Sequence, residues 1–402
     1  MERAISFLGI LVFIGISYAL SVNRRAIRWQ TVAWGLGLEF GFALLILKTS
    51  WGLNLFKSLG DAVSTFLSFS DEGAKFVFGA NFKDHFFAFQ VLPTIIFFSA
   101  FISVLYHYGI LQWVVNGLAW VMMKTMKTSG AESLSCAGNI FLGPTESPLM
   151  VKPFVATMTQ SELFAVMTGG FATIAGGVLG AYLSFGIPTE HLIAAFFMTA
   201  PTSLVVAKLL YPETEVSDTA GSVKMDVKTT YVNVIDAATT GAIDGVKIAV
   251  NVAVMIIAFL GLLAVVNALL GWFGGLVGLR QLSLEWILSF VMFPVAWLMG
   301  VPLADCPVVG TLLGKKTILN EFLAYVDLGE LIKQQKISQR AVIIATYALC
   351  NFANIGSIGI TIGGISGMAP TRQHDLARMG VKSMIGGLLA GFITACIAGM
   401  LV

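Results

Sequence analysis

Two glutamates stand in apolar regions that are interrupted by glycine, proline and small polar residues. Glu146 lies in the break 143–148, and Glu321 ends the break 315–321, behind two lysines. Inside a bilayer an ionised carboxylate costs about 2.5–3.5 kcal/mol on insertion scales, so it normally faces a cavity or a charged partner. Each glutamate is therefore either a structural ion-pair member with a nearby lysine, or a group that accepts hydrogen bonds from a polar solute or takes part in ion coupling.

Neutral polar residues cluster at two matching places along the chain. They are Asn139, Thr145, Thr173, Asn354 and Ser357. Unwound backbone at bilayer depth exposes carbonyl oxygens, and with amide and hydroxyl oxygens these are hard ligands suited to Na+. One such residue alone is usually just an interhelical hydrogen bond. Phe352, beside Asn354, could offer an aromatic wall to a flat or sugar-like ligand, although core packing is the default for a phenylalanine.

The sequence contains no complete motif for enzymatic chemistry. Residues 310–317 look like a phosphate-binding loop, but they are one residue short between the glycines and no strand precedes them. Metalloprotease, serine-hydrolase and paired-histidine patterns do not occur, and the four cysteines form neither a CxxC pair nor a zinc cluster. The sequence therefore predicts a protein that is not an enzyme and needs no cofactor.

The composition places these residues in a membrane. Hydrophobic residues make up 57% of the 402 residues and charged residues only 11%, where a soluble domain carries about 25% charged residues. The net charge of +2 is too small to indicate nucleic-acid binding. We expect an all-α polytopic protein embedded in the lipid bilayer.

A spanning helix needs about 20 apolar residues, and eight segments qualify. They are approximately 4–22, 31–47, 87–105, 163–184, 192–210, 248–270, 341–365 and 384–402. Residues 53–78 mix charges with apolar residues at helical spacing, which predicts a helix in the interface plane. The run 110–123 is too short to cross comfortably, and the polar stretch 212–240 is predicted to be a loop outside the bilayer.

Basic residues suggest the orientation. The cluster at 24–28 follows the first span, which argues against a cleaved leader and, by the positive-inside rule, places the cluster in the cytoplasm. The loop with Arg372, Arg378 and Lys382 agrees, whereas the basic residues at 333–340 do not. With eight spans, both termini are expected outside.

The two irregular regions form an internal repeat. Each has an apolar run, a break that holds charge, a second apolar run, and then a span with a broken, small-residue centre. The single clean span 248–270 between the units makes them inverted. Paired interrupted segments of this kind point to the midplane site of a secondary transporter. The alternative is that glycine-rich helices simply pack closely.

At these residues the sequence resembles the concentrative nucleoside transporters. Residues 143–149 match the family's Gly-Gln-Thr-Glu-(Ala/Ser)-Pro-Leu, and residues 320–325 match its Asn-Glu-Phe-(Val/Leu)-Ala-Tyr. Residues 350–359 match Cys-x-Phe-Ala-Asn-x-x-Ser-Ile-Gly. The likeness covers nearly the whole chain, with three specific motifs in the right order.

The resemblance implies a homotrimer in the bacterial inner (plasma) membrane. Each protomer would have eight transmembrane helices, two re-entrant helical hairpins and interfacial helices, with a transport domain that moves like an elevator against the third and sixth spans. The segments expected are 1–126 (scaffold part), 127–211 (first transport repeat), 212–282 (polar loop and sixth span, scaffold) and 283–402 (second transport repeat).

The resemblance also implies the site residues. Those expected at the nucleobase are Thr145, Glu146 and Val178. Those expected at the ribose hydroxyls are Glu321, Asn354 and Ser357, with Phe352 lining the pocket. Na+ is expected to be held by Asn139, Thr173 and the backbone carbonyls of Leu142 and Ile174. The implied function is Na+–nucleoside symport.

One departure and three alternatives remain. Pro144 replaces the family glutamine that reads the base edge, and it offers neither a side-chain amide nor a backbone N–H. We therefore expect weaker affinity or altered selectivity for the base. Asn139 favours Na+ over protons, but a proton-coupled nucleoside symporter with Glu146 or Glu321 titrating is the alternative. The alternatives from other functional classes are a passive channel and a membrane-embedded enzyme.

Overall fold

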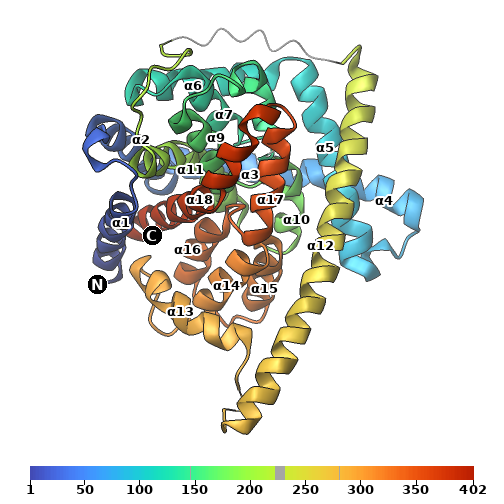
Figure 1. The fold of residues 1–402 in the computed structure, drawn as a ribbon. Helices are drawn as coiled ribbons and strands as arrows, with labels where there is room; N and C mark the ends of the chain where they lie inside the picture. Colours follow the sequence, from blue (N-terminus) through green and yellow to red (C-terminus); the bar gives the residue numbers. More distant parts are fainter. Residues whose placement is uncertain (145, 222–230, 280) are drawn as a thin grey trace.

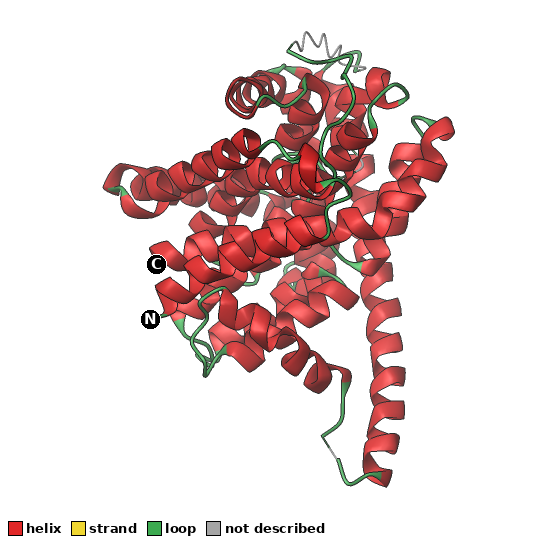
Figure 2. Cartoon of the chain, turned by 60° about the vertical axis from the view of Figure 1, so that its left-hand side comes forward, coloured by secondary structure: helices red, strands yellow, loops and turns green. Residues whose placement is uncertain are grey.

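The computed structural model describes residues 1–144, 146–221, 231–279 and 281–402. Within these ranges every regular element is a helix (Figures 1 and 2). Among the described residues, six helical stretches are long and apolar enough to cross a membrane, and the one that contains α5 begins at Ala88. They are α1 (Glu2–Ala19), α2 (Trp29–Lys48), α5 (Leu92–His107), α11 (Thr189–Leu210), α12 (Val234–Leu276) and α18 (Gln373–Leu401).

Two further spans are broken in the middle. The first consists of α9 (Gln160–Ala172), the short η5 (Gly176–Val178) and α10 (Leu179–Ser184), and the second consists of α16 (Gln339–Leu349) and α17 (Ile355–Ser366). Each break falls at the small polar segment that the sequence singled out. With the six continuous helices they give eight spans, so the predicted number is confirmed.

Each broken span is preceded by a helical hairpin. Hairpin 1 is made of α7 (Gly130–Gly138), η4 (Ser147–Val151) and α8 (Lys152–Val155). Hairpin 2 is made of α14 (Cys306–Ile318) and α15 (Glu321–Lys333). Proline at the start of η4, α8 and α14 suits the first helical turn, where no N–H donor is needed. The predicted pair of hairpins is therefore confirmed.

The remaining helices are shorter and connect the spans. They are α3 (Ser50–Ser68), α4 (Ser70–Phe78), α6 (Ile110–Met126) and α13 (Leu284–Leu298), with the short turns η1 (Arg24–Ala26), η2 (Phe82–His85), η3 (Phe86–Val91) and η6 (Pro370–Arg372). Two expectations were wrong in detail. Residues 53–78 form two helices, and the loop expected over 212–240 already becomes helical at Val234, because the Asn233 side chain accepts hydrogen bonds from the N–H groups of Ile235 and Asp236.

The spans differ in burial: α11 and α18 form the centre of a buried body, whereas the apolar windows of α1, α2, α5 and α12 are mostly exposed. In α11, 94% of the apolar window is buried, against 12% in α12. Helices α1 and α2 pack on α11 and α18, and α9 packs on both as well. Helix α12 packs mainly along α5 and stands at the edge of the molecule (Figure 1). Both termini lie close together in Figure 1, and the Arg3 side chain donates to the Val402 carbonyl at 3.0 Å.

The base of hairpin 1 and the start of α9 are built alike. Helix α7 begins with a capping box between Ser129 and Glu132, and α9 begins with one between Thr159 and Glu162. In such a box the side chain of each partner takes the backbone N–H of the other, so both helix starts are satisfied by local residues. The two carboxylates are left facing the same polar cluster.

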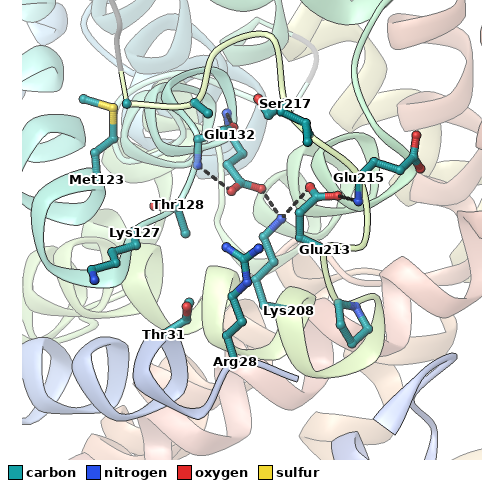
Figure 3. A pocket seen from close by; sticks show the side chains of 15 residues that line it. Arg28, Thr31, Met123, Lys127, Thr128, Glu132, Lys208, Glu213, Glu215 and Ser217 are labelled. Atoms are coloured by element: carbon teal, nitrogen blue, oxygen red, sulfur yellow. Dashed lines mark hydrogen bonds and ion pairs between the residues drawn. The ribbon is translucent and has the colours of Figure 1, made fainter. Parts of the chain in front are cut away.

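Lys208, near the end of α11, joins these helix starts (Figure 3). Its Nζ lies 2.6 Å from Glu132 Oε2 and 3.7 Å from Glu213 Oε2, and it donates to the Ser161 hydroxyl at 2.8 Å. The loop after α11 adds Ser217, which donates to Glu162. A cavity of about 340 Å³ opens beside the cluster, with Arg28 and Lys127 among its lining residues. The cluster fixes the base of hairpin 1 to α9 and α11.

We predict that Lys208→Met destabilises the fold strongly. The Lys208 side chain is 9% exposed and that of Glu132 2%, and removing one partner of a buried pair leaves an uncompensated charge, which costs about 3–5 kcal/mol. The free energy of unfolding in detergent micelles measures this loss, and the double variant Lys208→Met/Glu132→Gln should recover part of it.

The matched control is Lys247→Met. Lys247 pairs with Asp244, but both side chains are exposed, so its loss should change the free energy of unfolding by about 1 kcal/mol or less. Equal effects of the two lysine substitutions would contradict a stabilising role for the Lys208 cluster.

Candidate functional site

The two broken spans touch at their breaks. Thr173, at the end of α9, and Asn354, before α17, both have extended backbone. The Phe352 N–H donates to the Thr173 carbonyl at 3.0 Å. Because extended residues cannot complete helical hydrogen bonds, this link satisfies one group from each break. The contact also joins the two halves of the internal repeat at the place where the candidate residues lie.

Glu321 is held between the two halves. It is the first residue of α15, and it is 4% exposed. Its Oε1 accepts from the Tyr182 hydroxyl at 3.2 Å, and its Oε2 accepts from Asn354 Nδ2 at 3.4 Å. A carboxylate at a helix N-terminus is stabilised by the helix dipole. The structure therefore brings Glu321 and Asn354 together, as the sequence predicted.

Asn354 also organises the start of α17. Its Oδ1 accepts from the Ser357 N–H at 2.9 Å, which is an N-cap. The Ser357 hydroxyl is fully buried and has no hydrogen-bond partner within the described residues. An unpaired buried hydroxyl costs about 1–3 kcal/mol, so it is suited to pair with a bound polar molecule. Phe352 is only half-buried, which leaves part of its ring for a ligand.

Glu146 lies at the tip of hairpin 1, beside a cavity. Its Oε2 accepts from the Gly143 N–H at 3.0 Å, so the side chain folds back over the tip of hairpin 1. It lines a cavity of about 390 Å³ between hairpin 1, α5 and α12, together with Lys152 and Asp244. Glu321 does not line this cavity. The structure therefore does not place the two glutamates in one cavity.

The structural ion-pair reading of the two glutamates finds no support in the described part of the chain. There, no salt bridge joins Glu146 to Lys152 or Glu321 to a lysine. Lys315 instead pairs with Asp327 at 2.7 Å. At short range both glutamates therefore meet hydrogen-bond donors, while Lys316 acts on Glu321 electrostatically from beyond 4 Å.

Three further positions of the expected base site are Thr145, Val178 and Pro144. Thr145 lies outside the described residues. Val178 is buried at the end of η5, one turn before Tyr182. Pro144 packs against α9, where a Cβ added at Gly170 would lie 3.1 Å from the Pro144 Cβ. The proline thus fills space beside α9.

The residues expected for Na+ converge where α7 and α9 end. Asn139 caps the C-terminus of α7, is fully buried, and has no partner for either amide atom within the described residues. A Cβ added at Gly169 of α9 would lie 3.2 Å from Asn139 Nδ2. Thr173 Oγ1 donates to the Gly169 carbonyl at 3.1 Å. Orphaned oxygens beside the negative ends of two helices suit a small hard cation.

Two backbone carbonyls complete that expected set. Leu142 lies in the tip of hairpin 1, and Ile174 lies in the break after α9. Within the described residues neither carbonyl oxygen accepts a hydrogen bond. They belong to two different segments, so an ion that bound both would join the hairpin tip to the broken span.

Tyr182 was missed by the sequence reasoning. It reaches Glu321 across the repeat and is fully buried, with its ring centroid 4.4 Å from that of Tyr325. A tyrosine that is buried usually finds a partner for its hydroxyl, and that was the only signal available. The partner comes from a segment far away in the chain.

Three family models match successive parts of the chain. The Na+ dependent nucleoside transporter N-terminus matches residues 8–81, nucleoside recognition (Gate) matches 88–189, and the Na+ dependent nucleoside transporter C-terminus matches 191–399. Solute carrier family 28 member 3 of Homo sapiens is 46% identical over 415 residues, covering 100% of this chain and 60% of the relative. Sodium/nucleoside cotransporter 1 of Mus musculus is 47% identical over 416 residues, covering 100% and 64%. The chain spans about three fifths of the length of these curated relatives.

Solved structures show the same fold. CNTnw in an inward-facing substrate-bound state has a TM-score of 0.94 at 40% identity, covering 100% of this chain and 98% of that chain. A variant of CNTnw in an outward-facing state has a TM-score of 0.95 at 39% identity, with the same coverage. The curated relatives are cotransporters, with Na+ as the coupling ion, and not enzymes. On this evidence the chain belongs to the family of Na+-dependent nucleoside transporters.

Proposed function

We propose that this protein imports nucleosides by symport with Na+. The observation that carries the proposal is the pair of buried, unpartnered polar groups at the two breaks, the Asn139 amide and the Ser357 hydroxyl. Fold and family are those of Na+-dependent nucleoside transporters. Several buried polar groups in the described residues have no partner, although such groups are uncommon in folded proteins. These two stand out because they lie among the residues of the candidate site, where a ligand for each explains them.

The second half offers groups that suit a ribose. A ribose hydroxyl donates and accepts, so two of them can donate to the Glu321 carboxylate and accept from the Asn354 amide. Ser357 and Phe352 border the same break. For the base we propose Thr145, Glu146 and Val178. Pro144 removes an amide at this point, so contacts to the base edge depend on the other residues.

The first half offers the ion site, and the geometry suggests how binding is coupled. We propose Na+ between Asn139 and the Leu142 carbonyl of hairpin 1 on one side and Thr173 and the Ile174 carbonyl on the other. Thr173 is bonded through its own carbonyl to Phe352, which lies beside the ribose residues. Ordering the first break thus favours the nucleoside-binding arrangement of the second, and such coupling is reciprocal.

We propose an elevator-type movement of the buried body against α5 and α12. These two helices pack together at the edge of the molecule, and the apolar outer side of α12 suits lipid or a second copy in a homotrimer. Because α1 and α2 pack on α11 and α18, we place them with the moving body, which departs from the scaffold role expected for all of 1–126. Segments 127–211 and 283–402 move, and 212–282 stays. We place the protein in the plasma (inner) membrane with both termini outside.

We predict that reconstituted protein accumulates radiolabelled uridine only with an inward Na+ gradient. Asn139→Ala should raise the Na+ concentration for half-maximal uptake about tenfold, because the free energy of roughly one hydrogen bond or ion contact is lost. The control Asn54→Ala, on the exposed side of α3, should leave that concentration unchanged. Uptake that followed a pH gradient and ignored Na+ would identify a proton-coupled symporter and contradict the proposal.

We predict that Glu321→Gln lowers uridine affinity about tenfold to a hundredfold, because hydrogen bonds to a charged group are worth roughly 1.5–3 kcal/mol. The loss should be much smaller for 2′,3′-dideoxyuridine, which lacks the ribose hydroxyls. Equilibrium binding at saturating Na+ measures both. The control is Glu330→Gln, an exposed glutamate on the same helix; equal affinities for uridine in the two variants would remove Glu321 from the site.

A further inference from the structure

In each half of the molecule two helix C-termini meet beside a break. In the first half α7 ends at Gly138 and α9 ends at Ala172, and in the second half α14 ends at Ile318 and α16 ends at Leu349. Each helix C-terminus carries roughly half a negative charge from its unpaired carbonyls. Two such ends in a low-dielectric interior repel each other unless a cation lies between them. The halves should therefore share the need for a positive charge.

The second half contains a cation at this place. Lys316 lies in the last turn of α14 and is fully buried. Its Nζ is 3.4 Å from the Ala348 carbonyl oxygen at the end of α16 and 5.7 Å from the centroid of the Phe392 ring. Within the described residues no carboxylate lies within 4 Å of it. Its nearest partners are therefore a helix end and a ring face, while the Glu321 carboxylate acts on its charge from farther away.

Among the described residues, no lysine or arginine is bonded at the end of α7 in the first half. The first arm of hairpin 1 ends at the C-cap residue Asn139, whose amide atoms are buried and unpartnered in the described part of the chain. Lys208 sits at the beginning of this arm, bonded to Glu132, and so lies at the opposite end from Asn139. A neutral residue where two helix ends converge leaves room for an ion from solution.

We propose that Lys316 is the built-in cation of the second half, standing where the first half takes up Na+. This inference rests on the proposed function. Lys316 is a positioning residue: its ammonium holds the end of α14, which leads to Glu321, against the end of α16, which leads to Asn354. The second half then needs no ion of its own, and each nucleoside is carried with one Na+.

The test compares two adjacent lysines. Lys316→Met removes the charge and keeps much of the length, and Lys315→Met removes a charge that pairs with Asp327 and Glu285 nearer the surface. At saturating Na+, Lys316→Met should weaken uridine binding about tenfold or more, and Lys315→Met should leave it within about twofold. Lys316→Arg, which keeps the charge, should recover most of the affinity. Thermal denaturation of each variant checks that the fold is retained.

Uptake of ²²Na+ and ³H-uridine into the same proteoliposomes gives the ion ratio for the unaltered protein. A ratio of one supports the inference, and a ratio of two overturns it even if Lys316→Met does not fold. Unchanged uridine affinity in Lys316→Met, or equal losses in the Met and Arg variants, overturns the positioning role. Unaltered protein that binds uridine without regard to Na+ overturns the proposed function itself, which separates the two failures.

Discussion

The need to satisfy backbone polar groups at bilayer depth constrains this structure more than any other requirement. Lipid offers no hydrogen bonds, so a span can be broken only where the protein supplies partners. Here the two breaks supply partners to each other, since the Phe352 N–H donates to the Thr173 carbonyl. Side chains satisfy the helix starts that follow, with Asn320 capping α15 and Asn354 capping α17. The irregular backbone of the two breaks thus lies in the buried centre of the molecule.

A break in a helix also leaves two helix ends with partial charges. Side chains of the opposite charge stand at these ends. The N-terminal end of α15 carries Glu321, and the C-terminal end of α14, on the other side of the same break, carries Lys316. Both follow the sign of the helix dipole. These two charges therefore belong to the break of hairpin 2, beside the candidate site, whereas the buried Lys208–Glu132 pair belongs to the base of hairpin 1.

The sequence predicted most of what depends on local pattern. The eight spans, the two hairpins and the grouping of Glu321 with Asn354 follow from apolar length, glycine and proline breaks, and motifs. What it missed depends on long-range geometry. The Tyr182 hydroxyl meets Glu321 only because α10 and α15 are adjacent in space, and Glu146 faces α5 and α12 because its side chain turns back to Gly143. The early start of α12 reflects a local cap at Asn233 that lay within a stretch too polar to count as span.

Hairpin 1 combines a rigid base with an unsatisfied tip. At the base, Glu132 is bonded to Ser129 and Lys208, and the pair is almost wholly buried, so moving it would cost several kcal/mol. At the tip, neither the Asn139 amide nor the Leu142 carbonyl has a hydrogen-bond partner within the described residues. Local stability is therefore high at one end of the hairpin and low at the other. An ion bound at the tip can shift only the segment that is not already fixed, which is why a small cation can change the arrangement of the breaks without disturbing the base that holds the hairpin in the protein.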